Sequence, residues 1–156
     1  MRLLDTMLFR YFHDLGLLDE MLQLPGLGIT TAVLTHEISR KWQGKMPDLV
    51  QRVEKALAEG SLQLCDPASS EERALYSKYW DIEGFGEGES ASMAVAFSRG
   101  YTFVSYDSDA VARIGRLGVK VEDWSHLLAE LRDRGIITAA EHDRALRELR
   151  RMLRRP

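Results

Sequence analysis

The sequence contains one cysteine, four prolines and no long apolar run. The single cysteine, Cys65, cannot form an internal disulfide, which argues against a disulfide-rich secreted scaffold. The four histidines share no metal-ligand spacing, which argues against a zinc site. No apolar run approaches the roughly eighteen residues of a membrane span, and a charge follows Met1 too soon for a signal peptide. A cytoplasmic protein without membrane segments is therefore expected.

The chain length and the charge distribution limit the organisation of the protein. A length of 156 residues fits one domain over residues 1–156, which can bury roughly two thirds of the surface of its unfolded chain. The formal net charge of −3 gives no support for nucleic-acid binding. From residue 144 onward, however, Glu148 is the one acidic side chain, and the arginines are Arg144, Arg147, Arg150, Arg151, Arg154 and Arg155. This pattern is typical of a solvated or dimer-facing helix, and contact with a nucleic-acid backbone is the alternative.

Strand-like and helix-like segments alternate along most of the chain. Short strands are expected near residues 2–5, 29–31, 61–65, 101–105 and 119–121. Helices are expected at 15–24, 31–42, 48–59, 69–80, 90–97, 110–116 and 123–132. A last helix would begin at a capping box of Thr138 and Glu141. The alternation predicts an α/β fold with three α/β/α layers, a mostly parallel central sheet and a C-terminal helical hairpin over about residues 123–156.

Four acidic residues stand where this fold would bring them together. Asp5 and Asp107 follow the first strand and the strand at 101–105. Sites in open α/β sheets form outside the carboxyl ends of the strands, so both aspartates would face one crevice. Glu37 and Glu89 lie near the starts of helices that follow strands or turns, and they could reach the same edge. Each acid alone is commonly a turn, cap or helix-dipole residue, and the joint pattern favours a site.

The order of these motifs resembles the PIN-domain family. The chain has Leu3-Leu4-Asp5-Thr6, Leu34-Thr35-His36-Glu37, the small and apolar run from Gly88 to Ala96 that begins with Glu89, and Ser105-Tyr106-Asp107. It is similar to VapC-type toxins and, in particular, to a PIN-like subgroup with a Gly-Glu-x-Glu turn and a Gly-Ile-Ile-Thr-x-x-Glu tail. Here these are Gly86–Glu89 and Gly135–Glu141. The resemblance covers nearly the whole chain.

The resemblance implies a metal-dependent endoribonuclease that hydrolyses phosphodiester bonds of single-stranded or loop RNA. Carboxylate oxygens suit the hard cations Mg²⁺ and Mn²⁺, and one or two such ions activate water and neutralise the charge of the transition state. The catalytic acids would be Asp5, Glu37, Glu89 and Asp107, and the metal ligands Asp5, Glu89, Asp107 and, in second rank, Asp109. Supporting residues would be Thr6 and Ser105, which orient a carboxylate or water, and Glu87, which could replace Glu89. Candidates for contacts with RNA phosphates are Arg147, Arg151 and Arg154.

The family also implies partners and leaves alternatives. Many PIN domains are toxins that a small antitoxin protein neutralises, and many form homodimers. Family members usually carry Asn two residues after the first Asp, where this chain has Met7, which favours a PIN-like module that binds RNA or protein without turnover. A phosphatase or a receiver-type phosphoryl-transfer domain fits less well. The first strand of such a phosphatase is followed by Asp-x-Asp, where this chain has Asp5-Thr6-Met7.

Overall fold

A computed structural model describes residues 1–154, so Arg155 of the basic C-terminal segment lies outside the described residues. In the described part of the chain, one sheet of five strands has the order β3-β2-β1-β4-β5, and every neighbouring pair is parallel. The strands are β1 (Arg2–Leu4), β2 (Leu27–Ile29), β3 (Leu62–Leu64), β4 (Thr102–Ser105) and β5 (Val121–Asp123). The expected parallel sheet is confirmed, with β1 at its centre.

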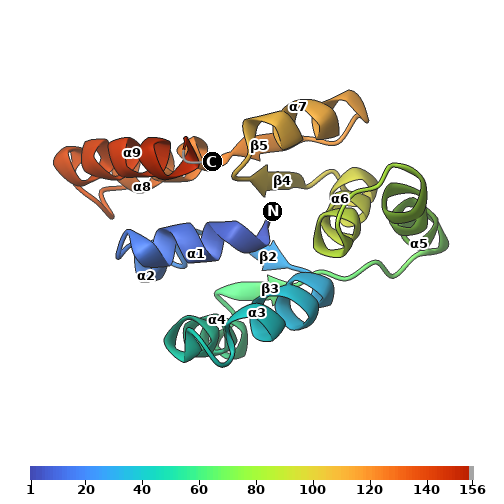
Figure 1. Cartoon of the computed structure of the whole chain (residues 1–156), viewed down its shortest axis with the longest axis horizontal. Helices are drawn as coiled ribbons and strands as arrows, with labels where there is room; N and C mark the ends of the chain where they lie inside the picture. Colours follow the sequence, from blue (N-terminus) through green and yellow to red (C-terminus); the bar gives the residue numbers. More distant parts are fainter. Residues whose placement is uncertain (155–156) are drawn as a thin grey trace.

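Helices connect the strands and cover both faces of the sheet (Figure 1). Between β1 and β3 lie α1 (Thr6–Asp14), α2 (Leu18–Met21), the π-helix η1 (Ala32–Ser39), α3 (Arg40–Trp42) and α4 (Pro47–Glu59). Between β3 and β5 lie α5 (Ser70–Ser77), the π-helix η2 (Lys78–Ile82), α6 (Glu87–Arg99) and α7 (Ser108–Arg116). The chain continues with α8 (Trp124–Asp133) and α9 (Ala139–Leu153), which form the expected C-terminal hairpin.

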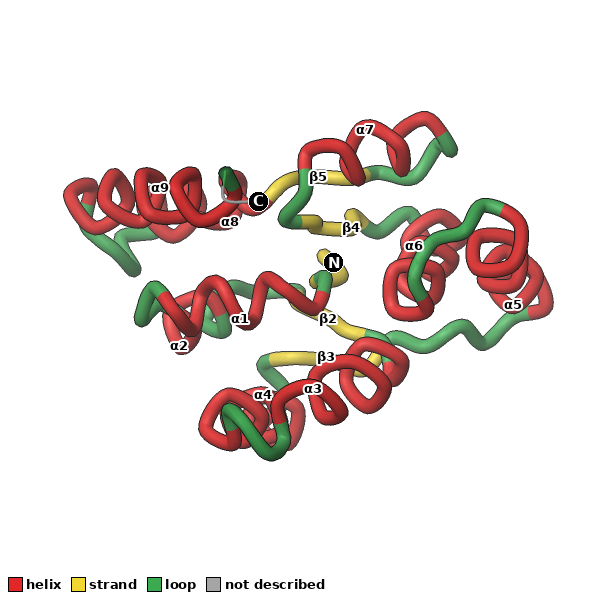
Figure 2. The backbone as a smooth tube through the Cα atoms, viewed as in Figure 1, coloured by secondary structure: helices red, strands yellow, loops and turns green. Residues whose placement is uncertain are grey.

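Alternate residues of the central strands enter two separate cores. Leu4 and Val104 pack with α1, α2, α4, α8 and α9, whereas Leu3 and Phe103 pack with α6 and α7. Successive strand residues point to opposite faces, so each short central strand contributes to both cores. Figure 2 shows the two helical layers on either side of the strands. The arrangement is the three-layer α/β/α fold that the sequence predicts.

The strand order reverses between β1 and β4. From β1 the chain builds the sheet outward through β2 and β3 on one side, and β4 and β5 lie on the other side. Val104 O accepts a hydrogen bond from the Asp5 N–H at 3.0 Å, so the carboxyl ends of these two strands lie side by side. This is the position at which open α/β sheets bind ligands.

Several boundaries differ from the expectations. Residues 6–14 form α1, which was not expected, and of the helix expected at 15–24 only Leu18–Met21 is helical. The apolar residues Leu8, Phe9 and Phe12 are fully buried at helical spacing, so core packing accounts for α1. Strands β2 and β5 are displaced by two residues from the expected ranges, and the helix expected at 69–80 continues as η2 to Ile82.

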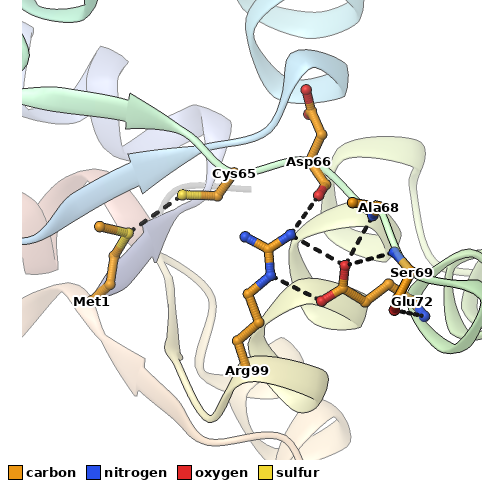
Figure 3. Close-up of polar contacts among 7 residues, drawn as sticks. All are labelled: Met1, Cys65, Asp66, Ala68, Ser69, Glu72 and Arg99. Atoms are coloured by element: carbon orange, nitrogen blue, oxygen red, sulfur yellow. Dashed lines mark hydrogen bonds and ion pairs between the residues drawn. The ribbon is translucent and has the colours of Figure 1, made fainter.

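An ion pair ties the C-terminal end of α6 to the start of α5 (Figure 3). Arg99 Nε donates to Glu72 Oε2 at 2.9 Å, and Glu72 Oε1 also accepts from the N–H groups of Ala68 and Ser69. Arg99 additionally donates to the Asp66 carbonyl oxygen at 2.8 Å. The Arg99 guanidinium therefore lowers the pKa of the Glu72 carboxyl to about 2. These contacts fix α6, whose opposite end carries Glu89.

Candidate active site

Asp5 is the most buried acid of the candidate site. It follows β1 and caps α1, and its Oδ1 accepts from the Thr6 N–H at 2.8 Å. The residue as a whole has an exposed fraction of 5%. Burial, with the charges of Glu89 and Glu37, raises the pKa of Asp5 to about 8. A carboxyl group is therefore held where its ionised form is unfavourable, which is characteristic of functional sites.

Glu37 reaches this position from the π-helix η1. Its Oε2 accepts a short hydrogen bond from the Thr6 hydroxyl, which joins η1 to the start of α1. The same carboxylate lies against the backbone of Gly88 in α6, because a Cβ built on Gly88 would be 2.5 Å from Glu37 Oε2. The glycine thus leaves the space that the Glu37 carboxylate occupies. π-Helical turns occur frequently at functional sites, and this one carries a site acid.

Glu89 and Glu87 differ in their surroundings, although both lie in the first turn of α6. Glu89 Oε1 accepts from the Gly86 N–H at 3.3 Å. Burial, the charge of Glu37 and that of Asp107 raise the pKa of Glu89, while Arg113 opposes the shift. Glu87 Oε1 instead lies 2.7 Å from His36 Nδ1 and accepts from the Tyr76 hydroxyl at 3.1 Å. The geometry favours Glu89 as the member of the carboxylate group.

Asp107, the fourth candidate acid, follows β4 by two residues. It is exposed, and its Oδ1 accepts from the Asp109 N–H at 2.9 Å, which caps α7. The Ser105 hydroxyl, which is fully buried, accepts from the Asp107 N–H at 3.3 Å. Asp109 is exposed in the first turn of α7.

Three of these acids influence the same neighbouring side chain, Tyr106. Burial and then the charges of Asp5, Glu89 and Asp107 raise the pKa of Tyr106 to about 12. Two cations also act on the group, since Lys41 lowers the pKa of Asp5 and Arg113 lowers that of Glu89. Neither cation was expected from the sequence, because each lies on a helix remote in sequence from the acid it affects.

The donor set is chemically suited to a hard divalent cation. Four carboxylates, one of them buried with a raised pKa, repel one another, and such a cation would relieve the repulsion. Within residues 1–154, no three His, Cys, Asp or Glu side chains are grouped closely enough to form a preassembled ligand set. A cation bound by these acids would therefore have to keep part of its water shell, as Mg²⁺ usually does.

Two larger pockets lie at opposite edges of the sheet. One of about 600 Å³ adjoins Asp107 and is lined by Tyr11, Tyr106 and Trp124. The other, of about 630 Å³, lies before the starts of β2 and β3, between α2 and α4. Ligands of α/β sheets bind at the carboxyl ends of strands, so the pocket beside Asp107 is the relevant one. None of the helices within the described residues is long and apolar enough to cross a membrane.

Comparisons with known proteins add information on the fold. No protein-family model matches the sequence, and no curated protein matches it. Among solved structures, this chain is similar to one in the crystal structure of VapBC2 from Rickettsia felis bound to a DNA fragment from their promoter. The TM-score is 0.53 and the identity 16%, over 79% of this chain and 98% of that chain. At this identity the similarity concerns the fold, and it agrees with the PIN-like α/β fold expected from the sequence.

Proposed function

We propose that the chain is a divalent-metal-dependent ribonuclease whose catalytic acids are Asp5, Glu37, Glu89 and Asp107. The observation that carries the proposal is the buried Asp5, with its pKa raised by burial and by two neighbouring glutamates, at the point where the strand order reverses. The similarity of the fold to a chain of a VapBC2 complex supports the same conclusion. Crowded carboxylates cost stability, and groups with strongly perturbed pKa values cluster at functional sites.

The four acids would hold Mg²⁺ or Mn²⁺, with Asp5 and Asp107 as direct ligands and Glu37 and Glu89 bound directly or through water. Asp109 is a second-rank ligand. When bound, the cation supplies a more acidic water and neutralises the charge that develops on the phosphate.

The residues around the acids orient them and limit access of water. The Thr6 hydroxyl holds Glu37, and its N–H holds Asp5, so one residue positions two acids. Ser105 restrains the backbone of Asp107. The burial of Asp5 excludes bulk water on the inner side of the site, which strengthens electrostatic interactions there.

The proposed substrate is single-stranded or loop RNA, because proteins read RNA mainly through unstacked bases. By resemblance to VapC-type toxins, a small antitoxin protein is the proposed protein partner, and the proposed assembly is a homodimer. The similar solved structure is named as a VapBC2 complex. Copurification of the chain with the product of an adjacent short reading frame would test the antitoxin partner.

Cleavage assays test the function directly. The purified protein should cleave single-stranded RNA slowly with Mn²⁺ or Mg²⁺ and be inactive in EDTA. Asp5→Asn and Asp107→Asn should abolish turnover, because an amide keeps the shape and removes the charge that holds the cation. Asp133→Asn is the matched control, since Asp133 is an exposed residue at the end of α8 that pairs with Arg132. Cleavage that survives chelation or is unchanged in both site variants would refute the proposal.

Met7 favours one second candidate, a PIN-like module that binds RNA or protein without turnover. In the structure Met7 is partly buried and packs against the core beneath α1. An apolar side chain at this position offers no hydrogen bond to the site two residues away. RNA binding without any metal-dependent cleavage across a broad RNA panel would select this function.

A further inference from the structure

The pocket of about 600 Å³ beside Asp107 has two chemically different halves. Its walls come from α1, from the segment after β4, from the start of α8 and from the end of α9. Pockets of this size accept small organic ligands. We refer to it as the Tyr11 pocket, and the lining residues that matter here are Tyr11, Tyr106, Asp107, Trp124, Arg150 and Arg154.

One half of the Tyr11 pocket is aromatic. The rings of Tyr11 and Tyr106 are 5.7 Å apart between centroids, at an angle of 61°. Both side chains are half-buried, so part of each ring faces the pocket, and Trp124 is nearly buried behind them with 8% exposure. Edge-to-face contact holds the tyrosines in place, which leaves a rigid platform for a planar group.

The other half of the Tyr11 pocket is cationic. Arg150 and Arg154 are exposed, and neither forms an ion pair within residues 1–154. The same two arginines also line a second hollow of about 420 Å³ that continues along α9. Arg151, in contrast, donates to Glu148 at 2.6 Å. Arg150 and Arg154 therefore line the Tyr11 pocket, whereas Arg147 and Arg151 line only the second hollow.

A simple anion does not account for this lining. Asp107 and Asp123 both line the pocket, and their charges oppose any small anion that approaches them. A nucleotide satisfies both halves, because its neutral base can lie on the tyrosines while its phosphate lies at the arginines. Bases stack on aromatic side chains in single-stranded nucleic acids, and arginines hold the phosphates.

We infer that the Tyr11 pocket binds one nucleotide of single-stranded RNA, adjacent to the phosphodiester at the acidic site. The base lies against Tyr11 and Tyr106, and Arg150 and Arg154 contact its phosphate. The inference rests on the proposed function and adds to it how the substrate is held. Because Asp107 belongs to both the acidic group and the pocket wall, a bound strand passes directly from one to the other.

Binding to a fluorescein-labelled, 12-nucleotide single-stranded RNA in EDTA tests the pocket by fluorescence anisotropy. Tyr11→Leu keeps the apolar contact with the core and removes the ring, and it should weaken binding roughly 5- to 100-fold. Arg150→Gln should weaken binding several-fold and reduce the slope of log affinity against log salt by about 1. Arg144→Gln, an exposed arginine on α9 that does not line the pocket, should change neither quantity. Thermal melting of each variant verifies that it is folded.

Two competitors test what the pocket recognises. Adenosine monophosphate should displace the labelled RNA at concentrations at which inorganic phosphate does not. A blunt duplex of the same sequence should bind more weakly and be insensitive to Tyr11→Leu, because its bases are stacked. Equal competition by phosphate and the nucleotide, or equal effects of Arg150→Gln and Arg144→Gln, would overturn the inference.

The outcomes separate this inference from the ribonuclease proposal, because binding is measured in EDTA, where no cleavage is expected. Binding through Tyr11 and Arg150 by a protein that never cleaves with Mn²⁺ supports the pocket and refutes the nuclease. Metal-dependent cleavage with unchanged binding and KM in both variants refutes the pocket and leaves the nuclease standing.

Discussion

Replacing Gly88 by alanine should displace one site acid, Glu37, without destabilising the fold. A Cβ at residue 88 would be 2.5 Å from Glu37 Oε2, whereas ordinary contact begins at 3.4 Å. The carboxylate must therefore retreat by roughly 1 Å, which a flexible glutamate side chain can do at little cost. A displacement of this size at a catalytic group can lower the rate by up to about 100-fold.

The effect of Gly88→Ala on stability should have the opposite sign. Gly88 lies in α6 with an ordinary helical φ, and alanine is more favourable than glycine in a helix by up to about 1 kcal/mol. We expect an unchanged or slightly raised Tm, by roughly 2–4 °C at most. Metal-dependent cleavage should fall by about 10- to 100-fold, and the affinity for Mn²⁺ should fall with it.

Gly115→Ala provides the matched control. Gly115 also lies within a helix, α7, and a Cβ there would meet only Val121 at an ordinary 3.6 Å. This variant should show a similar change in Tm and full cleavage. Full activity in Gly88→Ala would show that the position of Glu37 against α6 does not matter for turnover. A collapse of stability in that variant would show that the carboxylate cannot move as argued.

Three further variants test other parts of the structure. Asp5→Asn should raise the Tm at pH 7 in EDTA, because a neutral amide keeps the cap on Thr6 and removes the cost of burying a carboxyl that is ionised in the unfolded chain. The variant should also show a smaller rise in Tm with Mn²⁺, and a larger rise would contradict this. Glu72→Gln should lower the free energy of unfolding at pH 7 by about 1–3 kcal/mol in urea denaturation. The pKa of Glu72 is depressed to about 2 in the folded protein, so its ionised carboxylate stabilises the fold fully above its ordinary pKa of 4.5. This stabilisation is lost as the pH falls through 2. The variant should therefore match the wild-type stability only in strong acid. Gly28→Ala should lower the free energy of unfolding by about 1–3 kcal/mol in the same assay. Its Cβ would meet Cys65 Sγ at 2.9 Å and Leu3 Cδ2 at 3.0 Å in the closely packed centre of the sheet. Unchanged stability would contradict that packing.

The sequence was sufficient to predict the sheet and the two strand-end aspartates, since both depend on local patterns. Apolar runs that end at Asp5 and Ser105 identify the central strands, and parallel pairing places their ends together. The capping box of Thr138 and Glu141 was predicted in the same way, and it is present. Helix α1 was missed although its apolar residues Leu8, Phe9 and Phe12 have helical spacing, because Asp5 was interpreted as a strand end and not also as a helix cap.

Local sequence patterns could not predict the contacts between segments that are distant in the chain. The π-helical turn of η1 places Glu37 beside Thr6 and Gly88, which are 31 and 51 residues away in sequence. The influence of Arg113 on Glu89, and the ion pair of Arg99 with Glu72, likewise depend on how α5, α6 and α7 pack. Arg150 was not distinguished from its neighbours, because only the orientation of α9 decides which arginines face Asp107.

The helix caps at the acidic site have a consequence for the choice of cation. Asp5, Asp107 and Glu89 each have one carboxylate oxygen engaged by a backbone N–H, and Glu37 has one engaged by the Thr6 hydroxyl. Each acid thus has one oxygen free of such a hydrogen bond, and the bonded oxygen keeps one further lone pair. At the proposed cation site, single contacts would therefore form more readily than bidentate ones. Ca²⁺ takes six to eight oxygens and readily uses bidentate carboxylates, whereas Mg²⁺ takes fewer, single contacts and retains water. If the proposed cation site is correct, we expect the hydrogen bonds to these carboxylates to favour Mg²⁺ over the larger Ca²⁺.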